Sequence, residues 1–157
     1  MIKRILKWVF LGIISIFILC SLVLGYLIIG NPIVAYHNYQ LKKAVLSAKN
    51  ERKVTLNEIV PFKWDKVYTF GPYTTKSFIE DEIGIKSNSI HDSDSDIDVY
   101  VIFVNKNKVT ASVCSLLWDL CYDIQFDGCV TYDENAVFSV EKVDFPIGRD
   151  VIYLSKQ

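Results

Sequence analysis

The sequence contains no Asp, Glu, Lys or Arg between residues 8 and 41. Within this stretch, residues 9–30 form an almost unbroken apolar run. A helix of that length rises about 33 Å, enough to cross a hydrocarbon core of about 30 Å. The missing charges therefore predict a transmembrane helix at 9–30, preceded by a basic cytoplasmic tail at 1–8. The predicted partner of the helix is membrane lipid.

The end of the run also lacks a small-x-small cleavage site, because Leu27, Ile28 and Ile29 precede Gly30. Secretory signals have apolar regions of about 7–15 residues, which is shorter than this run. Cys20 follows Leu19, where a lipoprotein signal would have a small residue. A retained anchor is thus favoured over a cleaved signal peptide or a lipoprotein signal.

Acidic residues are missing from the first fifty positions, which hold six basic ones. Lys3, Arg4 and Lys7 crowd the first end of the apolar run, so the N-terminus is expected in the cytoplasm. The rest of the chain would then be extracytoplasmic at the cell membrane. Residues 31–51, with good helix formers, are expected to form a helical stalk.

Residues 51–157 hold eleven basic residues against eighteen acidic ones, a balance of −7. An acidic domain repels phosphate backbones, so nucleic acid is excluded as a partner. There is no Cys-x-x-Cys pair and no cluster of histidines, so a zinc site has no basis and no cofactor is expected. Cys114, Cys121 and Cys129 form an odd set. One pair could bridge in an exported domain, or all three are buried thiols.

The predicted fold class is α+β, a transmembrane helix followed by a small domain (52–157) with one helix and an antiparallel sheet. Thr74 or Thr75 caps the expected helix, Gly84 stops it, and Phe78, Ile79 and Ile83 form its buried stripe. Strands or extended segments are expected at 53–59, 64–70, 97–104, 109–116, 120–126, 128–132, 136–142 and 149–154.

An acidic run stands before one of these strands, at Asp92, Asp94, Asp96 and Asp98. Alternating carboxylates of this kind gather around Ca²⁺ in the first half of an EF-hand loop. The second half is missing, because Ile97 replaces the required Gly and Phe103 the bidentate Glu. The run is therefore a non-EF metal site or a solvated loop that protects the start of a strand.

The segment Ser95-Asp96-Ile97-Asp98-Val99 resembles the SDIDV strand of minimal nucleotidyltransferases. In that family, paired aspartates hold Mg²⁺ for nucleotidyl transfer. The family also has an upstream Gly-Ser turn that cradles phosphate, and Gly84-Ile85-Lys86-Ser87 does not match it. The resemblance implies a metal-dependent enzyme that uses Asp96 and Asp98.

The most distinctive segment runs from Pro61 to Gly84, with the pattern PF-x-WD-x-VY-x-F-x-PYT followed by a helix ending in Ile-Gly. It resembles a signature of short membrane-anchored or lipid-anchored proteins of low-GC Gram-positive bacteria. The hairpin sequence VIFVNKNKV fits the same group. This group has no assigned activity, so the resemblance implies a location in the cell envelope and no mechanism.

Four residues of this segment are candidates for a contact patch: Trp64, Asp65, Tyr68 and Tyr73. Exposed aromatic rings at a rigid Gly-Pro corner would bind a partner, whereas buried ones would belong to the core. No residue is predicted as catalytic. The sequence favours a binding module that contacts another envelope protein over a metal-dependent enzyme or a Ca²⁺-responsive surface domain.

Overall fold

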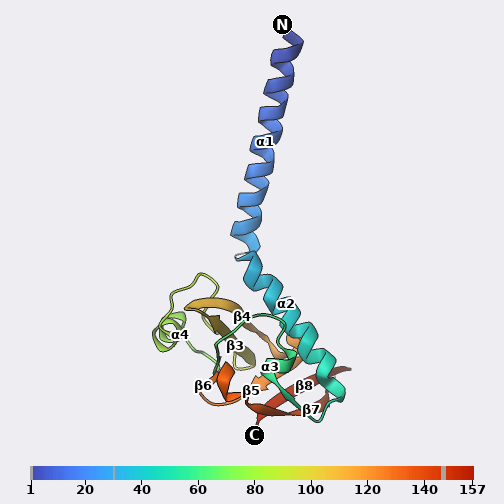
Figure 1. Ribbon diagram of the computed structural model, residues 1–157, viewed down its shortest axis with the longest axis vertical. Helices are drawn as coiled ribbons and strands as arrows, with labels where there is room; N and C mark the ends of the chain where they lie inside the picture. Colours follow the sequence, from blue (N-terminus) through green and yellow to red (C-terminus); the bar gives the residue numbers. More distant parts are fainter. Residues whose placement is uncertain (1, 30, 146–147) are drawn as a thin grey trace. The chain divides into compact units, whose positions relative to one another are not determined.

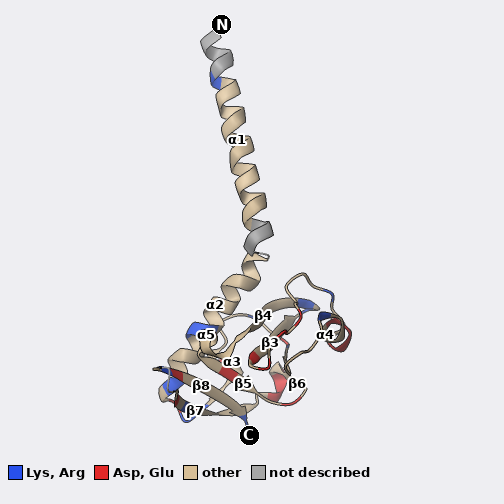
Figure 2. Cartoon of the chain, turned by 180° about the vertical axis from the view of Figure 1, so that it is seen from behind, with Lys and Arg blue, Asp and Glu red and all other residues tan. Residues whose placement is uncertain are grey.

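The computed structural model describes residues 2–29, 31–145 and 148–157. It divides into two compact units, Met1–Pro32 and Ile33–Gln157. The first unit is essentially one helix, α1 (Ile2–Ile29). Its window Lys7–Gly25 has a mean hydropathy of 2.6 and is not covered by other described parts of the chain. In Figure 2 the described part of α1 after Lys7 is tan throughout, the colour of residues other than Asp, Glu, Lys and Arg.

By length and composition, this window is suited to cross a membrane, as the sequence predicts. A signal sequence near the N-terminus passes the same test. A membrane anchor is therefore consistent with the structure.

The second unit contains two four-stranded sheets among its described residues (Figure 1). The first has the order β1-β7-β8-β5, with strands at Lys53–Thr55, Val137–Phe145, Arg149–Lys156 and Tyr122–Gln125. The second has the order β4-β3-β2-β6, with strands at Lys108–Leu116, Asp98–Asn105, Lys66–Phe70 and Cys129–Thr131. The predicted α+β class with antiparallel strands is confirmed. The structure adds two features: the strands are divided between two sheets, and β5 pairs with β8 in parallel.

Helix α4 (Lys76–Ile83) begins and ends where its sequence predicts. The Thr75 side chain accepts a hydrogen bond from the Phe78 N–H, and Gly84 ends the helix in the left-handed conformation with φ of 69°. Ile79 and Ile83 are buried, but Phe78, which was expected beside them, is 58% exposed. Consecutive helical residues point about 100° apart, so the narrow i, i+4 stripe of the two isoleucines leaves Phe78 outside.

The predicted extended segment at 53–59 is a strand only in its first half. Thr55 and Glu58 form a capping box, and one helical turn, α3 (Leu56–Ile59), follows. Each side chain bonds a backbone N–H at the start of that turn, which favours helix over strand at this point.

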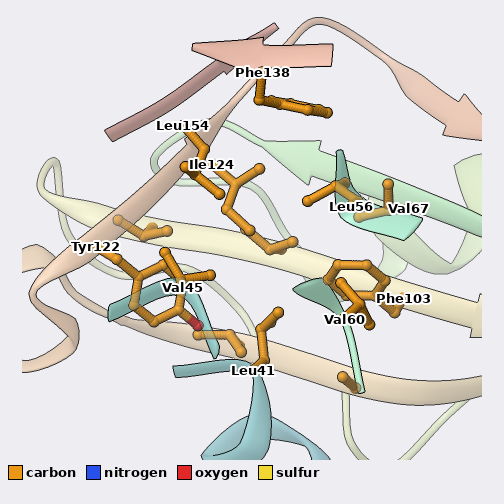
Figure 3. Close-up of a cluster of buried hydrophobic side chains, with 14 of the residues drawn as sticks. Leu41, Val45, Leu56, Val60, Val67, Phe103, Tyr122, Ile124, Phe138 and Leu154 are labelled. Carbon is orange, nitrogen blue, oxygen red and sulfur yellow. The ribbon is translucent and has the colours of Figure 1, made fainter. Parts of the chain in front are cut away.

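The main core is assembled from both sheets and from α2 (Pro32–Ser47). Figure 3 shows Leu41 and Val45 of α2 beside Tyr122 of β5, together with Phe103 of β3. All four residues are fully buried. Residues 31–51, predicted as a stalk, are thus helical from Pro32 through the short 3-10 helix η1 (Ala48–Asn50), and this helix forms part of the folded domain.

Two side chains of α2 bind the backbone of β4, which is an edge strand of its sheet. Asn38 Nδ2 donates to the Ser112 carbonyl at 2.7 Å, and the Ser112 N–H donates to Asn38 Oδ1 at 2.9 Å. His37 Nδ1 donates to the Thr110 carbonyl at 2.8 Å. The helix therefore satisfies backbone groups that a further strand would otherwise bond.

A third side chain ties α2 to the short helix α5 (Leu117–Leu120). Lys42 Nζ donates to the Asp119 carbonyl at 2.5 Å. This carbonyl lies in the last turn of α5, where a cation is favoured.

We expect Asn38→Ala to destabilise the domain by about 1–3 kcal/mol, because both backbone groups of the buried Ser112 lose their partner. Urea unfolding of the full chain in detergent measures this change. Gln40→Ala removes a neighbouring amide that bonds only the Tyr36 hydroxyl on the surface, so its effect should stay within about 0.5 kcal/mol. Equal effects of the two changes would contradict the assigned role of Asn38.

Candidate functional site

The four residues of the predicted contact patch do not lie on one shared surface in the structure. Trp64 is buried in the main core, where its ring makes edge contacts with Phe103 and Tyr132. Tyr68 packs on a second buried cluster formed by Ile79, Tyr100 and their neighbours. Strand alternation continued back to Trp64 would place it on the same face as Tyr68, but β2 begins only at Lys66, and Trp64, which precedes the strand, lies with Val67 in the main core.

Asp65 is exposed but is used by the fold. Its carboxylate accepts a hydrogen bond of 2.6 Å from the Lys106 N–H in the turn between β3 and β4. Lys106 and Asn107 have positive φ angles of 46° and 58°, as a tight hairpin turn requires. The best supported role of Asp65 is therefore to fix this turn.

Tyr73 is the one candidate of the four with a largely exposed ring, at 66%. Its φ of 57° places a bulky residue in the left-handed region, which costs about 1–3 kcal/mol. The strain lies at the corner Gly71-Pro72-Tyr73, where the Thr74 hydroxyl donates to the Gly71 carbonyl at 2.6 Å. An exposed, strained aromatic residue at such a corner is a candidate for a contact with a partner.

The four aspartates of the acidic run do not converge. Asp92 Oδ1 accepts from the Lys76 N–H at 2.7 Å, at the start of α4. Asp98 Oδ2 accepts from the Ser93 hydroxyl at 3.1 Å and from the Ser95 N–H at 3.2 Å. Asp94 and Asp96 are exposed.

Across the described ranges, no three His, Cys, Asp or Glu side chains are grouped to hold a metal ion. The structure therefore gives the predicted metal site no support. Two of the four carboxylates are instead occupied by bonds that order the loop before β3.

An open groove of about 710 Å³ lies between the two sheets. Its walls come from the end of β2 with Gly71 and Pro72, the start of β3, β5 with the turn that follows it, and Tyr153 of β8. The Thr69 hydroxyl donates to the Phe126 carbonyl at 2.6 Å and joins two of these walls. The volume falls within the range of ligand-binding pockets, but the groove is open to solvent and not enclosed.

The described lining of the groove is acidic and aromatic. Its aspartates come from two loops and two strands, and no Lys, Arg or His is among its described residues. The acidic members are Asp96, Asp98, Asp123 and Asp127, and the aromatic ones are Phe70, Tyr100, Phe126 and Tyr153.

The charge of Asp123 acts on its neighbours in the groove. Burial raises the pKa of Tyr153, and the negative charges of Asp123 and Glu141 raise it further. Asp123 itself accepts a hydrogen bond of 2.7 Å from Gln125 Nε2, which holds its carboxylate on the strand. A groove with this charge attracts cations and repels phosphate and carboxylate groups.

Aromatic walls add a second form of recognition. Tyr100 is 2% exposed and packs with Phe70 in the cluster around Ile79, so the lining rings that remain for a ligand are those of Phe126 and Tyr153, which are partly buried. The faces of such rings bind the guanidinium and ammonium groups of Arg and Lys. The arrangement is suited to bind a cationic chain, and it holds no nucleophile paired with a base among its described residues.

The sequence patterns include Asp96, Asp98 and the Gly71-Pro72 corner, and the structure brings these together in the groove. The sequence patterns do not identify Asp123, Asp127 and Tyr153 as site residues. Asp127-Gly128 indicates only a turn. Asp123 meets Tyr153 through the parallel register of β5 and β8, which local patterns do not encode.

All four cysteines are free. Burial raises the pKa of the Cys114 thiol to about 11, and the charges of Asp98 and Asp94 add to this effect. Cys129 is exposed on β6. No disulfide therefore joins the three cysteines of the domain in this structure.

Comparisons with known protein families, with curated proteins and with solved structures find no match to this chain. The resemblance of residues 61–84 to an envelope protein group therefore stays a prediction. Any function has to be argued from the geometry of the domain.

Replacing Tyr73 by glycine should raise the free energy of unfolding by about 0.5–1 kcal/mol, because glycine adopts positive φ without strain. Tyr73→Ala keeps a Cβ and hence the strain, so it should give no such gain. Thermal unfolding of the two full-length variants separates backbone strain from loss of the ring. Equal stability of the two variants would contradict strain at this position.

Cys114 should react with iodoacetamide more slowly than the exposed Cys129 at pH 8. A thiol with a pKa of about 11 is ionised in roughly one molecule in a thousand at that pH, and only the thiolate reacts. Peptide mass spectrometry of the alkylated chain measures both rates. Raising the pH to 10 should accelerate Cys114 by close to 100-fold. A Cys114 rate independent of pH would contradict the assigned protonation.

Proposed function

We propose that the chain is a single-pass membrane protein of the cell envelope and that its domain is an extracytoplasmic binding module. The apolar window Lys7–Gly25 supports the anchor. The basic residues Lys3, Arg4 and Lys7 before it favour an N-terminus in the cytoplasm. The domain then acts at the outer side of the membrane.

The acidic, aromatic groove carries the proposal of a binding function. The partner that we propose for the groove is a segment of another envelope protein, and this segment carries Lys or Arg side chains. The four aspartates attract the charges, and the partly buried rings of Phe126 and Tyr153 contact the apolar stems and the guanidinium groups. The strained, exposed Tyr73 directly follows Gly71 and Pro72 of the groove wall, and we propose that it adds an aromatic contact with the same partner.

A metal-dependent transferase is the less favoured reading. Asp96 and Asp98 both line the groove, but the Asp98 carboxylate already bonds Ser93 and Ser95. The groove has no described basic side chain to bind a nucleotide phosphate. Recognition of a cation does not need basic side chains in the groove.

The experiment places the photo-crosslinker p-benzoylphenylalanine at Ile97, which lines the groove and is 37% exposed. The matched control is Val137, which is 39% exposed on β7 and does not line the groove. We expect a protein adduct in native membranes from Ile97 and none from Val137. Equal adducts at both positions, or none at Ile97, would overturn the proposal.

The charge requirement is tested by combining the Ile97 crosslinker with Asp123→Asn and Asp127→Asn. Each lost attraction at a partly exposed site is worth about 0.5–1 kcal/mol, so the adduct should fall roughly fivefold or more. Asp81→Asn with Asp133→Asn removes the same charge from exposed positions outside the groove and should leave the adduct unchanged. If neither pair of substitutions changes the amount of protein adduct, the groove remains a binding site but its partner is not recognised by positive charge.

A further inference from the structure

Helix α2 presents an uncharged, aromatic face to solvent in its first two turns. Ile33, Tyr36 and Tyr39 are 63%, 58% and 65% exposed. At about 100° per residue, they lie on the side opposite to Leu41 and Val45, which are buried in the core. A helix face in water normally carries charged residues, and this one carries none before Lys42.

The sequence keeps this face close to the apolar helix. Tyr36 follows Ile29, the last residue of α1, by seven positions. The last four of these steps, from Pro32 to Tyr36, run along helix α2. Even a fully extended connection could carry Tyr36 no more than about 17 Å from the end of α1. A tyrosine at this distance is within reach of a bilayer surface, where its ring and hydroxyl suit the headgroup layer.

The distribution of charge favours a lipid partner for this side of the domain. Residues 31–50 hold Lys42, Lys43 and Lys49 and no acidic residue, whereas residues 51–157 have a balance of −7. Figure 2 shows blue segments and no red ones on the described part of α2, and red segments on α4. An anionic membrane surface attracts the first segment and repels the second.

We propose that the face of α2 formed by Ile33, Tyr36 and Tyr39 rests in the headgroup layer of a membrane that contains anionic phospholipid. This contact fixes the domain at the membrane, in addition to the covalent tether. It is separate from the groove and rests only on the membrane anchor of the proposed function.

The test uses the full chain in nanodiscs of phosphatidylcholine and phosphatidylglycerol in equal amounts. The crosslinker p-benzoylphenylalanine replaces Tyr36 or Tyr39, which keeps an aromatic ring at each site. Tyr132, which is 46% exposed on the short helix η2 (Tyr132–Glu134), is the matched control. Mass spectrometry after irradiation should find phospholipid adducts at Tyr36 and Tyr39 and none at Tyr132.

Phe17, in the apolar window, reports separately on the anchor. A phospholipid adduct at Phe17 with none at Tyr39 overturns the proposed contact and leaves the anchor in place. Adducts at Tyr36 and Tyr39 that contain only protein also overturn it. No lipid adduct at Phe17 rejects the anchor and with it this proposal, while the Ile97 experiment still decides on the groove.

Discussion

The bonds between Asn38 and Ser112 are the constraint on which the domain depends most directly. Ser112 lies on an edge strand and is 8% exposed, so its backbone groups need a partner other than bulk water. A side-chain amide offers one donor and one acceptor in the spacing of a strand backbone, and Asn38 uses both. The same register of α2 buries Leu41 and Val45. The position of α2 is thus set both by its bonds to the edge strand β4 and by its packing in the core. Because α2 occupies the backbone groups of Ser112, this part of the sheet edge is closed to pairing with another chain.

The groove follows from how the two sheets meet. Parallel pairing sets Asp123 beside Tyr153, so β5 brings a carboxylate and β8 an aromatic ring to one wall. The bond from Thr69 to the Phe126 carbonyl holds the turn after β5 against the end of β2. These segments lie far apart in the chain, and no sequence pattern links the end of β2 to β5 and its turn. The charged side chains of the described lining are all of one sign, which the fold concentrates in one place.

The features that could be predicted from sequence depend on neighbouring residues. The cap of α4 at Thr75, its end at Gly84 and the hairpin of β3 and β4 each follow from contacts within a few positions. The parallel pairing of β5 with β8 and the groove depend on contacts between distant segments, which periodicity does not report. Trp64 shows the difficulty for a single side chain, because an aromatic residue in a strand pattern fits a core as well as a contact patch. For Phe78, counting every apolar residue as part of a buried stripe ignored the helical angle.

The separation of charge along the chain makes the two proposed contacts support each other. An anionic lipid surface attracts the lysines of α2 and repels the aspartates of the groove, so lipid does not compete for the groove. The same surface concentrates cationic protein segments within about one Debye length, roughly 8–10 Å, of the headgroups. A domain held at that surface meets these segments at a raised local concentration, which lets a groove of modest affinity be occupied. Because both attractions are electrostatic, added salt should weaken them together, whereas the apolar insertion of α1 does not depend on salt.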